Sequence, residues 1–141
     1  MSKIAVVYWS GTGNTEKMAQ AVLDGAQASG VQADMYTASE FSADLVGAYD
    51  AIAFGCPSMG SEQLEEEEFE PMFASCEGGI AGKRIALFGS YGWGDGEWMR
   101  TWEDTCRGDN AIFACDSVIC NEEPDDEALA ACRALGEALA E

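Results

Sequence analysis

Short apolar runs recur along the chain, and segments with helical periodicity separate them. The strand-like runs cover residues 4–8, 31–36, 51–55, 84–89 and 111–119. Between and after them, apolar residues repeat at the i, i+3, i+4 spacing that marks one face of a helix. This spacing predicts helices over residues 16–28, 42–49, 69–76, 99–106 and 129–139. Strand and helix therefore alternate five times.

Such alternation predicts an α/β fold, in which a doubly wound, five-stranded parallel sheet carries helices on both faces. Runs 4–8, 51–55 and 84–89 are nearly all apolar, as buried parallel strands are. Run 31–36 alternates apolar and polar residues, and Asp116 interrupts run 111–119, so we expect both at the edges of the sheet. Because no linker or repeat divides the chain, residues 1–141 are predicted to form one domain.

Three loops are expected to share one site. In an open α/β sheet, ligands bind beyond the carboxyl ends of the strands, at the point where the strand order reverses. The loops that follow the first, third and fourth predicted strands are residues 9–15, 56–62 and 90–96. Each combines glycine with hydroxyl, aromatic or sulfur-containing side chains, so each is a candidate for ligand contact.

The first loop has the composition of a phosphate-binding loop. Its sequence SGTGNT, residues 10–15, joins a strand to a helix. Its glycines permit positive φ and close backbone approach, and the helix start offers N–H groups and a positive dipole end to an anion. Side-chain donors are available from Ser10, Thr12, Asn14 and Thr15. With no Lys or Arg in the loop, it suits one phosphate monoester and not a triphosphate with Mg²⁺.

Two better-known glycine loops do not match this segment. A Walker loop needs Gly-x-x-x-x-Gly-Lys-Ser/Thr, which is absent, and a dinucleotide fingerprint needs a third glycine where Glu16 stands. The alternative interpretation is an ordinary turn rich in serine and glycine, followed by a capped helix.

The second and third loops indicate a planar ligand. Met59 and Trp93 would both be covered by an aromatic ring bound between their loops, and Glu62 supplies a carboxylate that can only accept hydrogen bonds. The alternative is that Trp93 packs on its own loop or helix. Flavin mononucleotide (FMN), which has one phosphate, a planar ring system and a ring N–H, fits all three loops.

Composition narrows the classes of partner and chemistry. The chain has 26 acidic and 7 basic residues and a net charge of −19, which disfavours nucleic acid and anionic membranes and favours basic protein surfaces. The absence of histidine excludes Ser-His and Cys-His catalysis and most zinc sites. Six cysteines without a Cys-x-x-Cys motif predict no metal site, and we expect them as reduced core residues of a cytoplasmic protein. The first apolar run is too short for a signal peptide, and no stretch is long enough to span a bilayer.

The three loops together resemble those of the flavodoxins, of the short-chain kind known from anaerobic bacteria. The segments are YWSGTGNTE at 8–16, GCPSMGSE at 55–62 and LFGSYGWGDG at 87–96, and the resemblance extends over the whole chain. It implies the strand order 2-1-3-4-5 and non-covalently bound FMN. It further implies a monomeric one-electron carrier between redox enzymes that present basic surfaces. Because Glu62, the acidic run Glu65–Glu68 and the net charge would repel negative charge on the reduced ring, we expect a low potential for the semiquinone/hydroquinone couple.

The resemblance also implies individual roles for residues of the three loops. The phosphate is expected at Ser10, Thr12, Gly13, Asn14 and Thr15. The ring is expected between Trp93 and Met59, with its N3–H donating to Glu62 and with the Gly60–Ser61 peptide reorienting on reduction. Ser90, Tyr91 and Gly92 are expected along the ribityl chain. Pro57 is a departure, since some relatives have a hydroxyl residue there that contacts the phosphate, and Ser58 is the candidate substitute.

A second candidate function is that of an NAD(P)H-dependent FMN or quinone reductase on the same fold. Such an enzyme needs a nicotinamide site, for which the chain offers no basic cluster, and Trp93 would cover the ring face that hydride must approach. A phosphoaccepting receiver domain is excluded because it needs paired acids directly after the first strand, where Trp9 and Ser10 stand.

Overall fold

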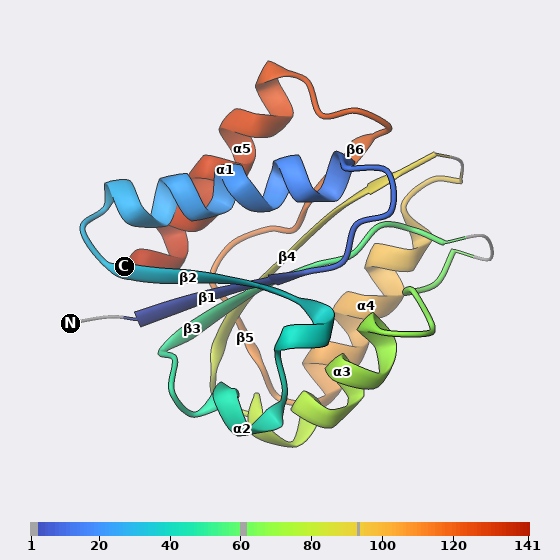
Figure 1. The fold of residues 1–141 in the computed structure, drawn as a ribbon. Coiled ribbons are helices and arrows are strands. Elements are labelled where there is room, and N and C mark those ends of the chain that lie inside the picture. Colours follow the sequence, from blue (N-terminus) through green and yellow to red (C-terminus); the bar gives the residue numbers. More distant parts are fainter. Residues whose placement is uncertain (1–2, 60–61, 93) are drawn as a thin grey trace.

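The fold is a parallel sheet between two layers of helices (Figure 1). The computed structural model describes residues 3–59, 62–92 and 94–141. Within them, six strands form the order β2-β1-β3-β4-β5, with β6 pairing with β4. The strands are β1 (Lys3–Tyr8), β2 (Gln32–Thr37), β3 (Ala51–Gly55), β4 (Arg84–Tyr91), β5 (Ile112–Phe113) and β6 (Val118–Asn121). This order confirms the predicted doubly wound α/β fold.

The helices divide between the two faces of the sheet. Figure 1 shows α1 (Asn14–Ala28) and α5 (Asp126–Ala140) over one face and α2 (Ala43–Val46), α3 (Phe69–Cys76) and α4 (Glu97–Gly108) over the other. The 3-10 turns η1 (Ala38–Glu40) and η2 (Glu77–Gly79) follow β2 and α3. Among the described residues, no helix has both the length and the apolar content that crossing a bilayer requires.

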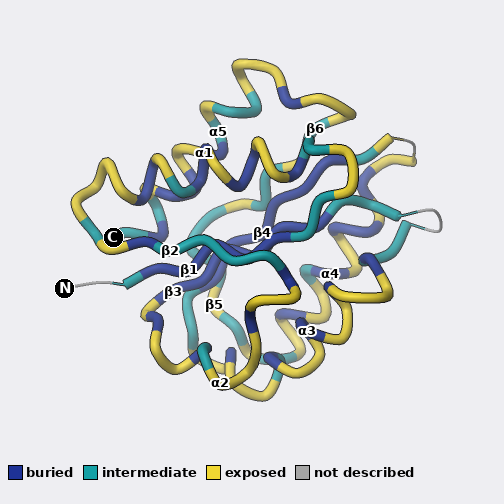
Figure 2. Tube along the Cα trace, in the orientation of Figure 1, coloured by how far each residue is buried: buried dark blue, intermediate teal, exposed yellow. Residues whose placement is uncertain are grey.

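The central strands are buried on both sides (Figure 2). On β1, Ala5 and Val7 pack into the core beneath α3 and α4, whereas Ile4 and Val6 pack into the core beneath α1 and α5. Because both faces of the strand are covered, its sequence is a continuous apolar run and not an alternating one. β2 pairs only with β1 and lies at one edge, as its alternating sequence predicts.

The fifth predicted strand is interrupted, which corrects the prediction of one strand over residues 111–119. Phe113 is opposite Ile85 and Val118 is opposite Phe88, so five residue steps on this strand match three steps on β4. The two extra residues loop out of the sheet. Ser117 Oγ holds this loop by donating a hydrogen bond of 2.6 Å to Glu103 Oε2 on α4.

Two glycines set the separation between α1 and α5. A Cβ atom at Gly25 would overlap the carbonyl oxygen of Arg133, and one at Gly136 would overlap the carbonyl oxygen of Val22. The helix backbones therefore approach each other at positions where only glycine fits, and this contact fixes the layer that covers one face of the sheet.

We predict that Gly25→Ala destabilises the protein by about 1–3 kcal/mol or more, because the added methyl group must push α5 away. Chemical denaturation measures the change. Gly47→Ala is the control, since Gly47 has φ −68° and ψ −15° and no atom lies within 4 Å of an added Cβ. The control is expected to be neutral or up to about 1 kcal/mol stabilising. Equal effects of the two substitutions would contradict the close-packing argument.

Candidate functional site

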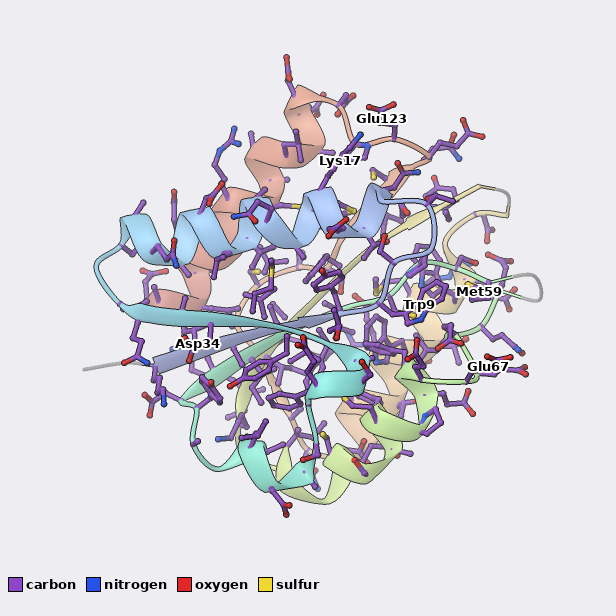
Figure 3. The ribbon with its side chains drawn as sticks, in the orientation of Figure 1. Trp9, Lys17, Asp34, Met59, Glu67 and Glu123 are labelled. Carbon is purple, nitrogen blue, oxygen red and sulfur yellow. The ribbon has the colours of Figure 1, made fainter. Side chains whose placement is uncertain are left out.

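The loops that leave the carboxyl edge of the sheet enclose a hollow of about 550 Å³, here called the carboxyl-edge pocket. It is lined by Trp9, Ser10, Gly11, Thr12, Asn14, Thr15, Pro57, Ser58, Met59, Ser90, Tyr91, Gly92, Glu122 and Glu123. The three loops singled out from the sequence therefore meet at one place. Trp9 and Met59 lie at this edge of the molecule in Figure 3.

The Ser10 side chain organises the start of α1. Its Oγ accepts hydrogen bonds from the backbone N–H groups of Gly13, at 3.1 Å, and Glu16, at 3.3 Å. Gly13 precedes the helix with φ 96°, a conformation that favours glycine. The first bond along the helix runs from the N–H of Lys17 to the carbonyl of Gly13, at 3.1 Å.

Two backbone donors at this helix start stay available for a ligand. The N–H groups of the first helical turn have no intrahelical acceptor, and Ser10 satisfies only those of Gly13 and Glu16. The N–H groups of Asn14 and Thr15, which open α1, are left to an external acceptor. The positive end of the helix dipole lies at the same point. This is a binding arrangement for an anionic group.

Hydrogen bonds tie the three loops to one another. The N–H of Trp9 donates to Gly55 O and the N–H of Ser58 donates to Ser90 O, each at 3.0 Å. Between the first and third loops, the buried hydroxyls of Thr15 and Ser90 are joined by a hydrogen bond of 3.2 Å. The pocket walls are thus fixed to the ends of β1, β3 and β4, and their relative positions follow from the sheet.

Glu62 is the last residue of the second loop. It has φ 49°, and its Oε1 is buried with no hydrogen-bond partner among the described residues. A Cβ at Gly94 would overlap this carboxylate unless the Glu62 side chain moved, and Gly94 has φ 86°, a conformation that favours glycine. The side chain lines a neighbouring groove between α3 and α4 and not the carboxyl-edge pocket itself.

The remaining predicted residues divide into three groups. Ser10, Thr12, Asn14, Thr15, Ser58, Met59, Ser90, Tyr91 and Gly92 all line the pocket. Gly13 shapes the helix start without lining the pocket. Gly60, Ser61 and Trp93 lie outside the described residues.

Five lining residues were not assigned individual roles from the sequence: Trp9, Gly11 and Pro57 belong to the predicted loops, whereas Glu122 and Glu123 were missed altogether. Trp9 is the first residue of the first loop, and its Nε1–H donates to Glu68 Oε1 at 3.0 Å, which ties this loop to the acidic run Glu65–Glu68 before α3. Glu122 and Glu123 follow β6. The strand before them pairs with the end of β4, and this pairing, which the sequence does not show, brings both glutamates to the pocket.

The surroundings of the pocket are acidic. No Lys or Arg occurs among the described residues that line it. The nearest cation along the chain, Lys17, forms an ion pair of 3.0 Å with Glu123, and both side chains are exposed (Figure 3). Exposed pairs of this kind contribute little energy. A negative charge placed in the pocket would therefore depend on backbone N–H groups and neutral side chains.

Glu65 fixes the acidic segment that follows the second loop. Its buried carboxylate accepts hydrogen bonds from the backbone N–H groups of Glu67, Glu68 and Phe69 at 2.7–2.8 Å and so caps α3. Burial alone would raise the pKa of Glu65, but these three donors outweigh it and lower the pKa below 4.5. Capping thus accounts for part of the acidic run Glu65–Glu68.

Comparisons with known proteins agree on one family. The family model described as flavodoxin matches residues 6–136. The chain is 45% identical to a flavodoxin of Clostridium beijerinckii over 86% of this chain and 88% of that one, and 42% identical to a flavodoxin of Megasphaera elsdenii over 97% and 98%. The solution structure of the two-electron reduced Megasphaera elsdenii flavodoxin matches with a TM-score of 0.89, covering 97% of this chain and 98% of that one.

We predict that Glu65→Gln lowers stability by about 1 kcal/mol at pH 7, as the loss of a helix cap does. A depressed pKa in the folded state stabilises the protein above pH 4.5, and this contribution disappears as pH falls through the folded-state value. The variant is therefore expected to lose less stability than the parent on acidification below pH 4.5. Denaturation at several pH values measures this, with exposed Glu67→Gln as the control. Parallel pH profiles for parent and Glu65→Gln would contradict the assignment.

Proposed function

The chain belongs to the flavodoxin family, and from that premise we propose that it is a low-potential one-electron carrier with FMN bound non-covalently in the carboxyl-edge pocket. Flavodoxins carry a flavin and transfer electrons, and they are not enzymes. Family membership therefore decides against the second candidate, a nicotinamide-dependent reductase. When bound, FMN supplies the ring system that accepts and releases the electron.

The strongest support for FMN rather than another flavin comes from the start of α1. The available N–H groups of Asn14 and Thr15, with the hydroxyls of Ser10 and Thr12, form a donor set for one phosphate. The lining lacks the basic side chains that a longer phosphate chain would call for. Pro57 lines the pocket but offers no hydrogen-bond donor to a phosphate. We propose that the hydroxyl of neighbouring Ser58 makes this contact instead.

The other two loops supply the walls for the ring. We assign Met59 to one face and Trp93 to the other, and we assign Glu62 to the ring N3–H. The support for Glu62 is its buried, unpartnered Oε1, because a buried acceptor without a donor is costly unless a ligand completes it. The proposed peptide reorientation at Gly60–Ser61, and the ribityl contacts of Ser90, Tyr91 and Gly92, follow from the family resemblance.

Local charge supports a low reduction potential. Adding an electron to the ring adds negative charge beside the Glu62 carboxylate, close to Glu122 and Glu123, in a pocket whose described lining has no cation. Coulomb repulsion in a partly desolvated site disfavours that charge. The protein therefore binds the oxidised ring better than the reduced ring, which lowers the potential.

The acidic surface supports a partner with a basic face. The chain carries a net charge of −19, and two of the pocket-lining residues are exposed glutamates. We propose redox enzymes with basic surfaces as electron donors and acceptors, with association that slows as salt is added. We also propose a monomer in the cytoplasm, where six free cysteines would stay reduced.

The first test compares FMN with riboflavin, which lacks the phosphate. The flavin-free protein is expected to bind FMN far more tightly, and Ser10→Ala is expected to weaken FMN by about tenfold or more while changing riboflavin little. Fluorescence titration measures both affinities. Ser29→Ala, at the far end of α1, is the control. Equal affinities of the parent for the two flavins would refute the phosphate assignment.

The second test measures the reduction potential of the bound flavin. Glu62→Gln removes a charge beside the ring and is expected to raise the potential, whereas Glu141→Gln removes a charge far from it. A tenfold change in a one-electron equilibrium corresponds to about 59 mV, and we expect a shift of that order for Glu62→Gln only. If potentiometry gives the same shift for both variants, or none for either, local charge does not set the potential.

A further inference from the structure

One edge of the sheet offers strand-pairing positions that the fold does not use. In the described part of the chain, β5 and β6 pair with β4 and with no other strand. Alternate backbone N–H and C=O groups of such an edge strand point away from its neighbour and are free to pair with a strand of another chain. β6 (Val118–Asn121) is longer than β5, so it is the better template for pairing.

Exposed apolar side chains mark this edge. Among the described residues, the large hydrophobic side chains that are exposed are Ile112 on β5, at 52%, and Ile119 on β6, at 39%. Edge strands of soluble proteins usually carry charged residues or proline, which discourage pairing with other chains. The opposite edge of the sheet differs, because the exposed residue of β2 is the polar Gln32. The edge formed by β5 and β6 therefore lacks the protection that β2 has.

Apolar side chains lie on both faces of β6. Ile119 lies toward the start of α4, since a Cβ at Gly96 would be 3.1 Å from its Cδ1 atom. On the other face, Val118 and Cys120 are half-buried and pack at the margin of the core beneath α1 and α5. A further strand beside β6 would therefore place apolar side chains opposite Ile119 on one face and opposite Val118 and Cys120 on the other.

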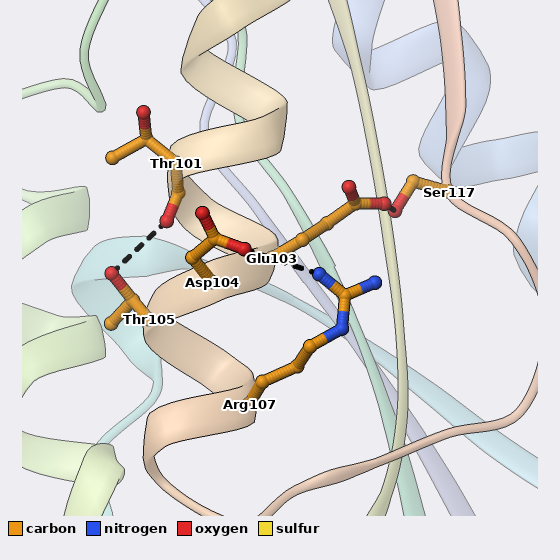
Figure 4. Close-up of polar contacts among 6 residues, drawn as sticks. All are labelled: Thr101, Glu103, Asp104, Thr105, Arg107 and Ser117. Carbon is orange, nitrogen blue, oxygen red and sulfur yellow. Dashed lines mark hydrogen bonds and ion pairs between the residues drawn. The ribbon is translucent and has the colours of Figure 1, made fainter.

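Hydrogen bonds hold both ends of β6. Before its start, Ser117 Oγ donates to Glu103 Oε2 on α4 at 2.6 Å (Figure 4). At its end, the side-chain amide of Asn121 and the backbone N–H of Glu122 both donate to Tyr91 O, at 3.3 Å and 2.7 Å. Tyr91 lines the carboxyl-edge pocket. A chain bound along β6 would therefore reach the rim of that pocket.

Exposed carboxylates flank β6 on both sides along the chain. Asp116 precedes the strand, and Glu122 and Glu123 follow it. Lys17 pairs with Glu123 at 3.0 Å, but exposed pairs of this kind contribute little. A second copy of this chain, with its net charge of −19, would be repelled from this edge. A strand that carries basic side chains would be attracted to it.

We propose that the outer edge of β6 binds an extended, basic segment of a protein partner, which adds one strand to the sheet. Backbone hydrogen bonds to β6 hold the segment, and its apolar side chains cover Ile119 on one face and Val118 and Cys120 on the other. Its lysine or arginine side chains lie near the flanking carboxylates. The inference rests on the proposed function in one respect, since it takes a redox enzyme as the partner because this edge ends at the carboxyl-edge pocket.

Three capped hexapeptides separate backbone pairing from charge. The probe KTVIVK has lysine at both ends and apolar residues on both faces of an extended chain. It is expected to shift the amide signals of Ile119, Cys120 and Asn121 in ¹H–¹⁵N spectra and to slow hydrogen exchange of the outward-facing amides of β6. The analogue KTVPVK keeps the charge but removes a backbone donor, and we expect it to bind about tenfold more weakly or worse. The acidic analogue ETVIVE is expected not to bind.

Matched variants decide between the β6 edge and the net charge of the protein. Ile119→Lys places a positive charge on the edge, and we expect it to weaken KTVIVK by about fivefold or more. Gln32→Lys places the same charge on β2 and is expected to leave binding unchanged. Asp116→Asn leaves the strand intact and is expected to weaken binding more than Asp44→Asn, which removes an exposed charge on α2. Equal binding of KTVIVK and KTVPVK, or equal effects within either pair of variants, would overturn the proposal.

Titrations with and without FMN separate this inference from the proposed function. Shifts of the β6 amides by KTVIVK in both forms are the expected result. If FMN binds but the peptide leaves these amides unchanged, the edge assignment fails and the proposed function stands. If the peptide binds and FMN does not, the reverse holds. If the Ile119 signal changes with protein concentration in the absence of peptide, the occupant is a second copy of this chain, and the assignment of a basic partner is wrong.

Discussion

The site depends on how the first turn of α1 distributes its backbone N–H groups. One serine hydroxyl, that of Ser10, satisfies the donors of Gly13 and Glu16 and leaves those of Asn14 and Thr15 to a ligand. Because these donors belong to the helix, their direction is fixed by the packing of α1 on the sheet. An anion bound there is held without any basic side chain, so the pocket gains affinity for phosphate while its surroundings stay acidic.

In our proposal, phosphate binding and control of the reduction potential are carried out by different parts of the site. In the complex that we propose, the helix start holds the phosphate, whereas Glu62, Glu122 and Glu123 place negative charge near the ring. Tight binding of a flavin and a low potential are opposite electrostatic demands when a site has a uniform charge. In the proposed complex the two demands act at different ends of the flavin. The hydrogen bond between Thr15 and Ser90 joins the first and third loops and so fixes the pocket walls relative to each other.

The sequence predicts the central strands well because short, continuous apolar runs are typical of parallel strands that are buried on both faces. The run 51–55 is β3 without a change of boundary. The fifth strand could not be predicted in the same way, because its interruption depends on register with β4 and on the bond from Ser117 to Glu103. The same holds for the site. The glycines and hydroxyl residues of the loop after β1 predict its binding role, whereas Glu122 and Glu123 line the pocket only because β6 pairs with β4.

The central claim is that the N–H groups of Asn14 and Thr15 receive the phosphate of the flavin. Amide ¹H–¹⁵N spectra of the flavin-free protein test it directly when FMN, riboflavin and inorganic phosphate are added in turn. We expect large shifts of the Asn14 and Thr15 amide signals with FMN, smaller shifts in the same direction with phosphate at high concentration, and little change with riboflavin. Equal shifts with FMN and riboflavin, or unchanged amide signals when FMN binds, would contradict it.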